Sequence, residues 1–112
     1  MIISERYSRQ SVDRQLGALA ASLARVASAA RKPARAAGLP AMLDECIRYI
    51  EWTAPQLAPE AGAELADVQL MLGLWRAGWP VAQTSASQRL LLALQAQKWS
   101  DQALQYSGLA DA

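Results

Sequence analysis

Apolar side chains recur at alternating steps of four and three residues along much of this chain, and this spacing constrains the fold more than any other feature. One series near the start consists of Val12, Leu16, Leu19, Leu23, Val26 and Ala30. A second series near the end consists of Leu92, Ala96, Trp99, Ala103 and Tyr106. Such steps place side chains on one face of an α-helix. Each segment is therefore predicted to be a helix with an apolar seam that faces other helices.

Proline and glycine divide the chain into four segments of this kind. We predict helices at residues 8–31, 40–52, 60–77 and 85–107. The third helix is expected to stop at Gly78-Trp79-Pro80, because proline disrupts the interior of an α-helix. Ser8 or Ser11 can cap the first helix, Ser85 with Gln88 resembles a capping box for the fourth, and Gly108 with Leu109 suits its C-terminal end.

The fold class follows from composition as well as from spacing. Ala and Leu are abundant, Phe is absent and β-branched residues are sparse, so helix formers outweigh strand formers. A chain of 112 residues forms one domain and buries enough surface to fold without a metal or a disulfide. We predict an all-α single domain over residues 1–112, a small antiparallel bundle of about four helices.

The third predicted helix is apolar on nearly all sides. Its core face is expected to be Leu65, Val68, Leu72 and Trp75, while Leu70, Met71 and Leu74 extend the apolar surface around it. One small bundle cannot cover such a helix completely, so we expect self-association, as a homodimer. Trp52 and Trp79 stand at predicted helix ends, where they either join an interface or close the end of the core. The predicted protein interface comprises Trp52, Leu70, Met71, Leu74 and Trp79.

Charge is unevenly distributed. Residues 1–35 carry seven basic and two acidic side chains, which is +5, and residues 36–112 carry four basic and eight acidic ones, which is −4. Arg25, Arg31, Lys32 and Arg35 form a possible basic patch. Because the overall net charge is only +1 and no readout motif occurs, nucleic acid is an unlikely partner, and a solvated linker explains the patch better.

The residues required by common catalytic and metal sites are missing. The chain has no His, one cysteine (Cys46) and no glycine-rich phosphate loop. We expect no catalytic, cofactor-binding or metal-binding residues, and we expect Cys46 to pack in the core rather than to sense redox state. Leu16 to Ala24 could imitate part of a signal peptide, but neighbouring charges oppose this interpretation. No run approaches the ~18 apolar residues of a membrane span. The single cysteine cannot form an internal disulfide and suits a reducing compartment, so a cytoplasmic location is expected.

These observations predict a non-enzymatic adaptor or regulator that engages another protein through an apolar helical surface. The alternative is a helical structural subunit of a larger assembly, including a nucleoprotein complex contacted through the basic patch at Arg25–Arg35. In general style the chain resembles the small helical antiactivators, secretion chaperones and complex subunits of bacteria. That resemblance implies a protein partner and rests on style rather than on any motif.

Overall fold

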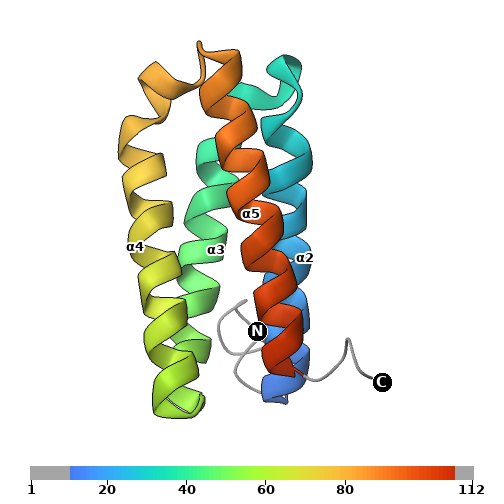
Figure 1. Cartoon of the computed structure of the whole chain (residues 1–112), viewed down its shortest axis with the longest axis vertical. Coiled ribbons are helices and arrows are strands. Elements are labelled where there is room, and N and C mark those ends of the chain that lie inside the picture. The colour runs from blue at the N-terminus through green and yellow to red at the C-terminus, as the bar shows by residue number, and fades with distance from the viewer. Residues whose placement is uncertain (1–10, 108–112) are drawn as a thin grey trace, which may run out of the picture.

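Four long helices pack against one another in the computed structural model, which describes residues 11–107 (Figure 1). They are α2 (Val12–Ala30), α3 (Leu39–Thr53), α4 (Pro59–Ala82) and α5 (Ala86–Ser107). Two short 3-10 helices, η1 (Pro33–Gly38) and η2 (Ala54–Gln56), connect α2 to α3 and α3 to α4. No strand occurs in the described range, so the predicted all-α class is confirmed.

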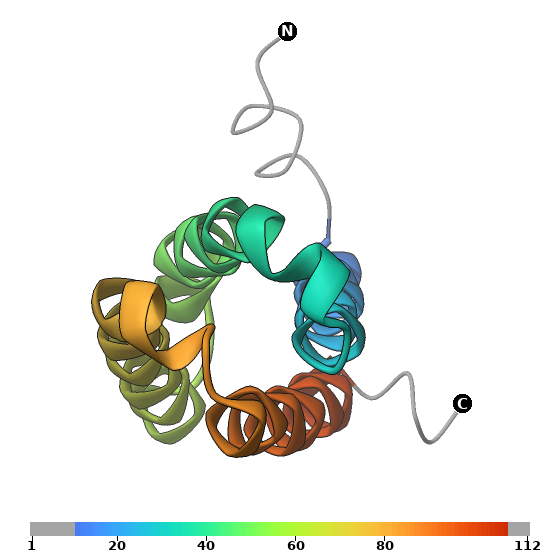
Figure 2. The same ribbon diagram turned by 90° about the horizontal axis from the view of Figure 1, so that it is seen from above.

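Viewed along the bundle, the helices form a ring in the order α2, α3, α4, α5 (Figure 2). The closest partnerships are α2 with α5, α3 with α4, and α2 with α3. Helix α4 makes much less contact with α5. This weak pairing leaves one side of the ring incompletely closed.

The α2–α5 contact is built from small side chains. Ala20 and Ala27 of α2 and Ala93, Ala96 and Ala103 of α5 are all buried. The hydroxyl of Ser100 on α5 donates a hydrogen bond of 2.7 Å to the backbone carbonyl of Ala20. Small residues let two helix backbones approach closely, and the Ala-rich composition of the first helix is explained by this packing.

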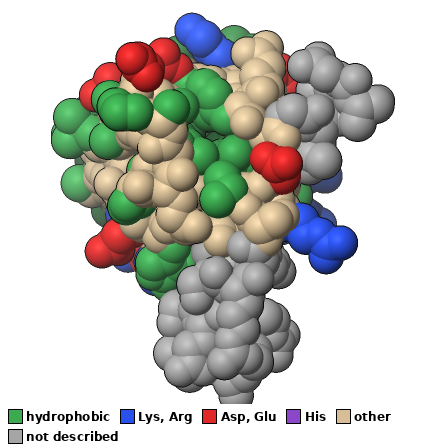
Figure 3. Space-filling view, turned by 90° about the horizontal axis from the view of Figure 1, so that it is seen from below, with side chains coloured by type: hydrophobic (Ala, Val, Ile, Leu, Met, Phe, Trp, Pro, Cys, Tyr) green, Lys and Arg blue, Asp and Glu red, His purple; other side chains and the backbone are tan. Residues whose placement is uncertain are grey.

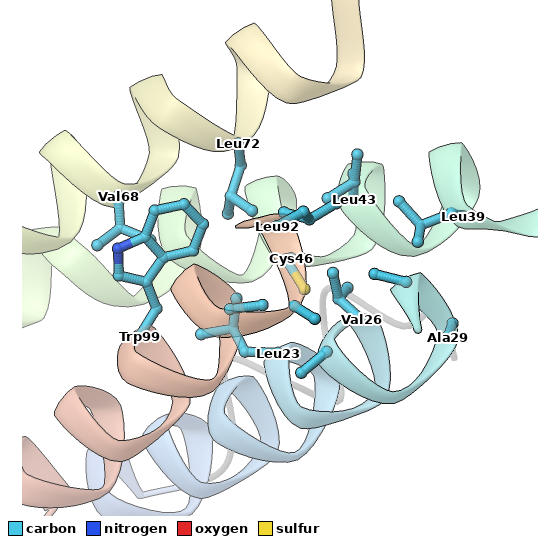
Figure 4. Close-up of a cluster of buried hydrophobic side chains, with 14 of the residues drawn as sticks. Leu23, Val26, Ala29, Leu39, Leu43, Cys46, Val68, Leu72, Leu92 and Trp99 are labelled. Atoms are coloured by element: carbon cyan, nitrogen blue, oxygen red, sulfur yellow. The ribbon is translucent and has the colours of Figure 1, made fainter. Parts of the chain in front are cut away.

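The core contains the seams that the spacing predicts. Leu16, Leu19, Leu23 and Val26 of α2 are completely buried, and so are Leu43, Cys46 and Ile50 of α3 and Leu92, Ala96 and Ala103 of α5. Figure 4 shows side chains from all four helices meeting there, including Cys46 and Trp99. Burial in this cluster confirms the packing role expected for Cys46.

Helix α4 is longer than predicted, and the expected stop at Gly78-Trp79-Pro80 is wrong. The helix passes through Pro80 and ends at Ala82, and the Gln83 amide donates to the Trp79 carbonyl at 2.9 Å. Pro80 has no N–H and cannot donate the helical hydrogen bond. Because Pro80 lies in the last turn of α4, only a short part of the helix follows this lost bond. The Trp79 side chain is 1% exposed and donates a 2.8 Å hydrogen bond to the Ala36 carbonyl of η1. Tertiary packing of this ring holds the last turn in helical form.

Helix α2 begins at Val12 rather than at residue 8, and the other helix bounds differ from the predicted ones by one residue at most. Ser11 caps α2, accepting from the Arg14 amide at 3.2 Å, and the Ser85 hydroxyl accepts from the Gln88 amide at 3.3 Å before α5. Ser8, Gly108 and Leu109 lie outside the described residues. At the start of α4, a Cβ on Gly62 would lie 2.8 Å from the Ala54 carbonyl oxygen, so only glycine allows α4 to approach η2 this closely.

Candidate protein-binding surface

The weak contact between α4 and α5 has a clear polarity along the bundle. Near the start of α4, Gln102 of α5 donates a 3.1 Å hydrogen bond to the Glu64 carboxylate. Further along, the Trp75 indole donates a 2.8 Å hydrogen bond to the Gln95 side-chain oxygen. Beyond Trp75, toward the connection at residues 83–85, a groove of about 530 Å³ separates the two helices.

This α4–α5 groove is lined by uncharged side chains among the residues that the structure describes. Apolar groups form most of its wall, and amide and hydroxyl groups stand along the α5 side and at the connection. The lining comprises Met71, Leu74, Trp75, Gly78, Val81, Ala82, Thr84, Ser85, Gln88, Leu91 and Gln95. A groove of this composition suits an apolar side chain or helix ridge better than an ionic ligand.

Helix α4 also carries a second apolar seam on its outer face. Leu70, Leu74, Ala77 and Val81 follow one another at steps of four, three and four, and all four are exposed. Successive residues turn by roughly 100° around a helix, so Leu74 lies about 200° away from Leu72, which is completely buried. We call this set the outer seam of α4. The outer seam is one side of an apolar surface that continues through Met71 into the groove.

The exposed fractions on the outer seam are unusually large for leucine and valine. Leu70 is 65% exposed, Leu74 is 59% exposed and Val81 is 78% exposed. Leu91 and Leu94 of α5 are also exposed, at 43% and 54%. Isolated exposed leucines are common, but a contiguous apolar patch on a soluble domain marks an interaction surface.

The five predicted interface residues are not all brought together. Leu70, Met71 and Leu74 are exposed on α4, as expected. The structure corrects the interface prediction for Trp79, because this residue is buried in the core and closes the end of the bundle beside η1. Trp52 is half-buried near the end of α3, with its ring centroid 5.9 Å from that of Tyr49. Trp52 does not line the groove.

Sequence reasoning missed Ala77, Val81 and Leu91 as surface residues. Val81 and Ala77 complete a heptad pattern with Leu70 and Leu74, but the pattern is recognisable only if the helix continues past Pro80. Leu91 lies beside the apolar stripe of α5, and its exposure depends on how far α4 stands from α5. Trp75, expected in the core, is only half-buried and forms part of the groove wall.

The predicted basic patch is divided by the structure. Arg25 lies 3.4 Å from the Glu45 carboxylate and donates a 2.8 Å hydrogen bond to Ser22. Arg31, Lys32 and Arg35 are exposed at the η1 connection, and Arg89 of α5 lines the same small depression as Arg31. We call Arg31, Lys32, Arg35 and Arg89 the basic end.

The opposite end of the bundle, where α4 begins, carries the acidic side chains Glu60 and Glu64. Figure 3 looks onto this end and shows acidic side chains at several places between hydrophobic ones. The uneven charge of the sequence therefore corresponds, in part, to a separation of basic and acidic side chains between the two ends of the bundle.

Two titratable groups of the described residues are clearly perturbed. Burial raises the pKa of the Cys46 thiol to about 12, with a further contribution from Glu45. Burial, followed by the charge of Glu45, also raises the pKa of Tyr49. A thiol with such a pKa is protonated at neutral pH and is a poor nucleophile.

The range of residues 11–107 contains no group of three or more His, Cys, Asp or Glu side chains that could hold a metal ion. None of its helices combines the length and the hydropathy that crossing a bilayer requires. Comparison with protein-family models, with curated proteins and with solved structures finds no match for this chain.

Proposed function

We propose that this chain is a non-enzymatic adaptor or regulator that binds a helix of another protein on the surface formed by α4 and α5. The observation that carries the proposal is the outer seam of α4, which is exposed and continuous with an uncharged groove. A helix with apolar residues at heptad spacing complements such a surface, because its ridge of side chains can enter the groove.

The available apolar area supports a stable contact. Complete burial of a leucine is worth about 1.5–3 kcal/mol, so covering one that is already half-buried contributes about 1 kcal/mol. Leu70, Leu74, Val81 and Leu91 together therefore offer several kcal/mol before the cost of association is subtracted. Among residues 11–107, those that line the groove include no acid, base or cationic group to provide chemistry, which favours binding over catalysis.

Three further features belong to this proposal. The helices run antiparallel to their chain neighbours, which the positions of the connections at alternate ends of the bundle support (Figure 1). The protein self-associates through the outer seam. It works in the cytoplasm, a compartment whose reducing conditions suit a single free thiol such as Cys46.

The test compares partner capture by the wild-type chain, by Leu74→Glu and by Leu91→Glu. Ala21→Glu is the control, because Ala21 is exposed on α2, which does not neighbour α4 in the ring and contributes no residue to the groove (Figure 2). A specific partner should be retained by the wild type and by the control and lost by both leucine variants. Binding should then be reproduced by calorimetry with the purified partner. A partner that binds both leucine variants as tightly as the wild type contradicts the proposal.

A second candidate function rests on the basic end. Arg89, which is distant in sequence, joins Arg31 beside the η1 connection, and no acidic side chain among residues 11–107 forms an ion pair with either arginine. This concentration of positive charge would suit a phosphate backbone in a nucleoprotein assembly. Arg25 does not strengthen this candidate, because Glu45 already pairs with it.

A further inference from the structure

We propose that the outer seam of α4 binds the same seam of a second copy of this chain, running in the opposite direction, in a two-fold symmetric dimer. This inference rests on the proposed function, since both require the surface of α4 to bind a helix. It goes further by proposing that a second copy of this chain covers the outer seam when the partner helix is absent, and by giving the direction and the register of that copy.

The order of large and small residues along the outer seam is self-complementary in this arrangement. A two-fold axis between Leu74 and Ala77 places Leu74 against Ala77 of the second copy and Leu70 against Val81 of the second copy. Each symmetric pair thus combines a larger side chain with a smaller one. Antiparallel helices that share a heptad seam interleave their side chains in this manner.

The backbone around the axis leaves room for close approach. Gly73 and Gly78 lie on either side of the Leu74–Ala77 centre, and a Cβ added to either glycine would meet no atom within 4 Å. The same register brings Gly73 opposite Gly78 of the second copy. Small residues near the crossing point of two helices shorten the distance between their axes and increase the area that each leucine buries.

The distribution of charged residues along α4 favours an antiparallel over a parallel pairing of the two copies. The acidic residues of α4, Glu60, Glu64 and Asp67, all precede the outer seam. From Val68 to Ala82 the one ionisable side chain is Arg76, whose Nε lies 3.1 Å from the Asp44 carboxylate of α3. A parallel dimer would bring the two acidic segments side by side. In the antiparallel dimer, each acidic segment lies toward the half of the other α4 that carries no acidic residue, and toward the basic end of the other copy, which favours association.

The experiment uses the full chain with one added cysteine, Leu70→Cys or Val81→Cys, under mild oxidation at tens of micromolar. In the proposed register, positions 70 and 81 face each other, while two copies of position 81 are displaced by about 16 Å along the axis. Disulfides require Cα atoms within about 7 Å. An equimolar mixture should therefore give a disulfide-linked heterodimer, and neither variant should cross-link efficiently alone. The wild-type chain is the control, because Cys46 is buried.

Light scattering provides the second readout. The wild-type chain should have twice its monomer mass of 12.1 kDa. Ala77→Glu should raise the dissociation constant more than about tenfold, because it buries an unpaired charge at the axis, whereas Ala21→Glu should not. A monomeric wild type overturns the inference, and so does efficient cross-linking of Val81→Cys with itself. If the wild type is monomeric but Leu74→Glu still abolishes partner binding, this inference and the proposed self-association fail, and the proposed binding of another protein stands.

Discussion

Replacing Trp79 by Phe should destabilise the fold much more than the same change at Trp75, although the two residues stand four positions apart on α4. Trp79 is 1% exposed and its indole donates to the Ala36 carbonyl. Trp75 is half-buried and its indole donates to the side chain of Gln95. The same side-chain replacement is made at both sites, so a difference between the two losses of stability arises from the different surroundings of Trp79 and Trp75.

The cost at Trp79 has two parts. A net intramolecular hydrogen bond is worth about 1 kcal/mol, and the Ala36 carbonyl keeps its other donor, the Leu39 amide. Replacing indole by phenyl vacates roughly 40 Å³, which costs about 1 kcal/mol as a cavity in addition to about 1 kcal/mol of lost transfer free energy. We therefore expect Trp79→Phe to lower the free energy of unfolding by about 2–3 kcal/mol.

At Trp75 the corresponding loss should be below about 1 kcal/mol, because Gln95 can turn to water and the vacated space opens to the groove. Urea denaturation followed by circular dichroism measures both variants against the wild type. The dependence of the free energy of unfolding on urea concentration should be unchanged if each variant keeps a two-state transition. A loss at Trp75 equal to or greater than that at Trp79 would refute the assignment of Trp79 to the core and of Trp75 to the groove wall.

Three further predictions concern the two faces of α4, the buried thiol and the basic end. At protein concentrations low enough for the chain to be monomeric, Leu74→Glu should keep the helical circular dichroism signal and change stability by less than about 1 kcal/mol. Leu72→Glu should cost more than about 4 kcal/mol, because it buries a charge. Similar losses would contradict the opposite exposure of these faces. Since the folded-state pKa of Cys46 is raised from 9.0 to about 12, stability should be independent of this group below pH 9 and should fall by about 1.4 kcal/mol per pH unit between pH 9 and about pH 12. Cys46→Ala should make the measured slope shallower, and an unchanged slope would contradict the effect of burial. Single-stranded RNA and duplex DNA should bind more weakly than micromolar at ~150 mM salt, and tighter binding that is lost on neutralising the basic end would support the nucleoprotein alternative.

The spacing of apolar residues was sufficient to predict the helices and most of the core. Leu16, Leu23, Leu65, Leu72 and Leu92 all belong to series that are recognisable in the sequence, and all are buried. Helix periodicity is a local property of the chain, so it can be read without knowing which helices meet. The same reasoning identified Leu70 and Leu74 as apolar residues in excess of what one core face needs.

The end of α4 could not be predicted, because local and tertiary effects oppose each other there. Pro80 disfavours helix locally, but the hydrogen bond from Trp79 to Ala36 joins segments that are 43 positions apart. Only the packing of α4 against η1 shows that the helix continues and that the ring of Trp79 faces inward. The exposure of Val81 and the full length of the outer seam follow from that continuation.

The location of the candidate surface was likewise decided by tertiary structure. The sequence determined that this chain forms helices and carries more apolar surface than one small bundle needs. It did not determine where the excess remains exposed, because this depends on which helices pair most closely. Helix α5 packs against α2 through alanines and Ser100, so it leaves its contact with α4 incomplete and the groove open. The spacing of apolar residues defines the faces of each helix. Side-chain size and hydrogen bonds between distant residues determine which helices pack together, and this packing determines which faces remain available for binding.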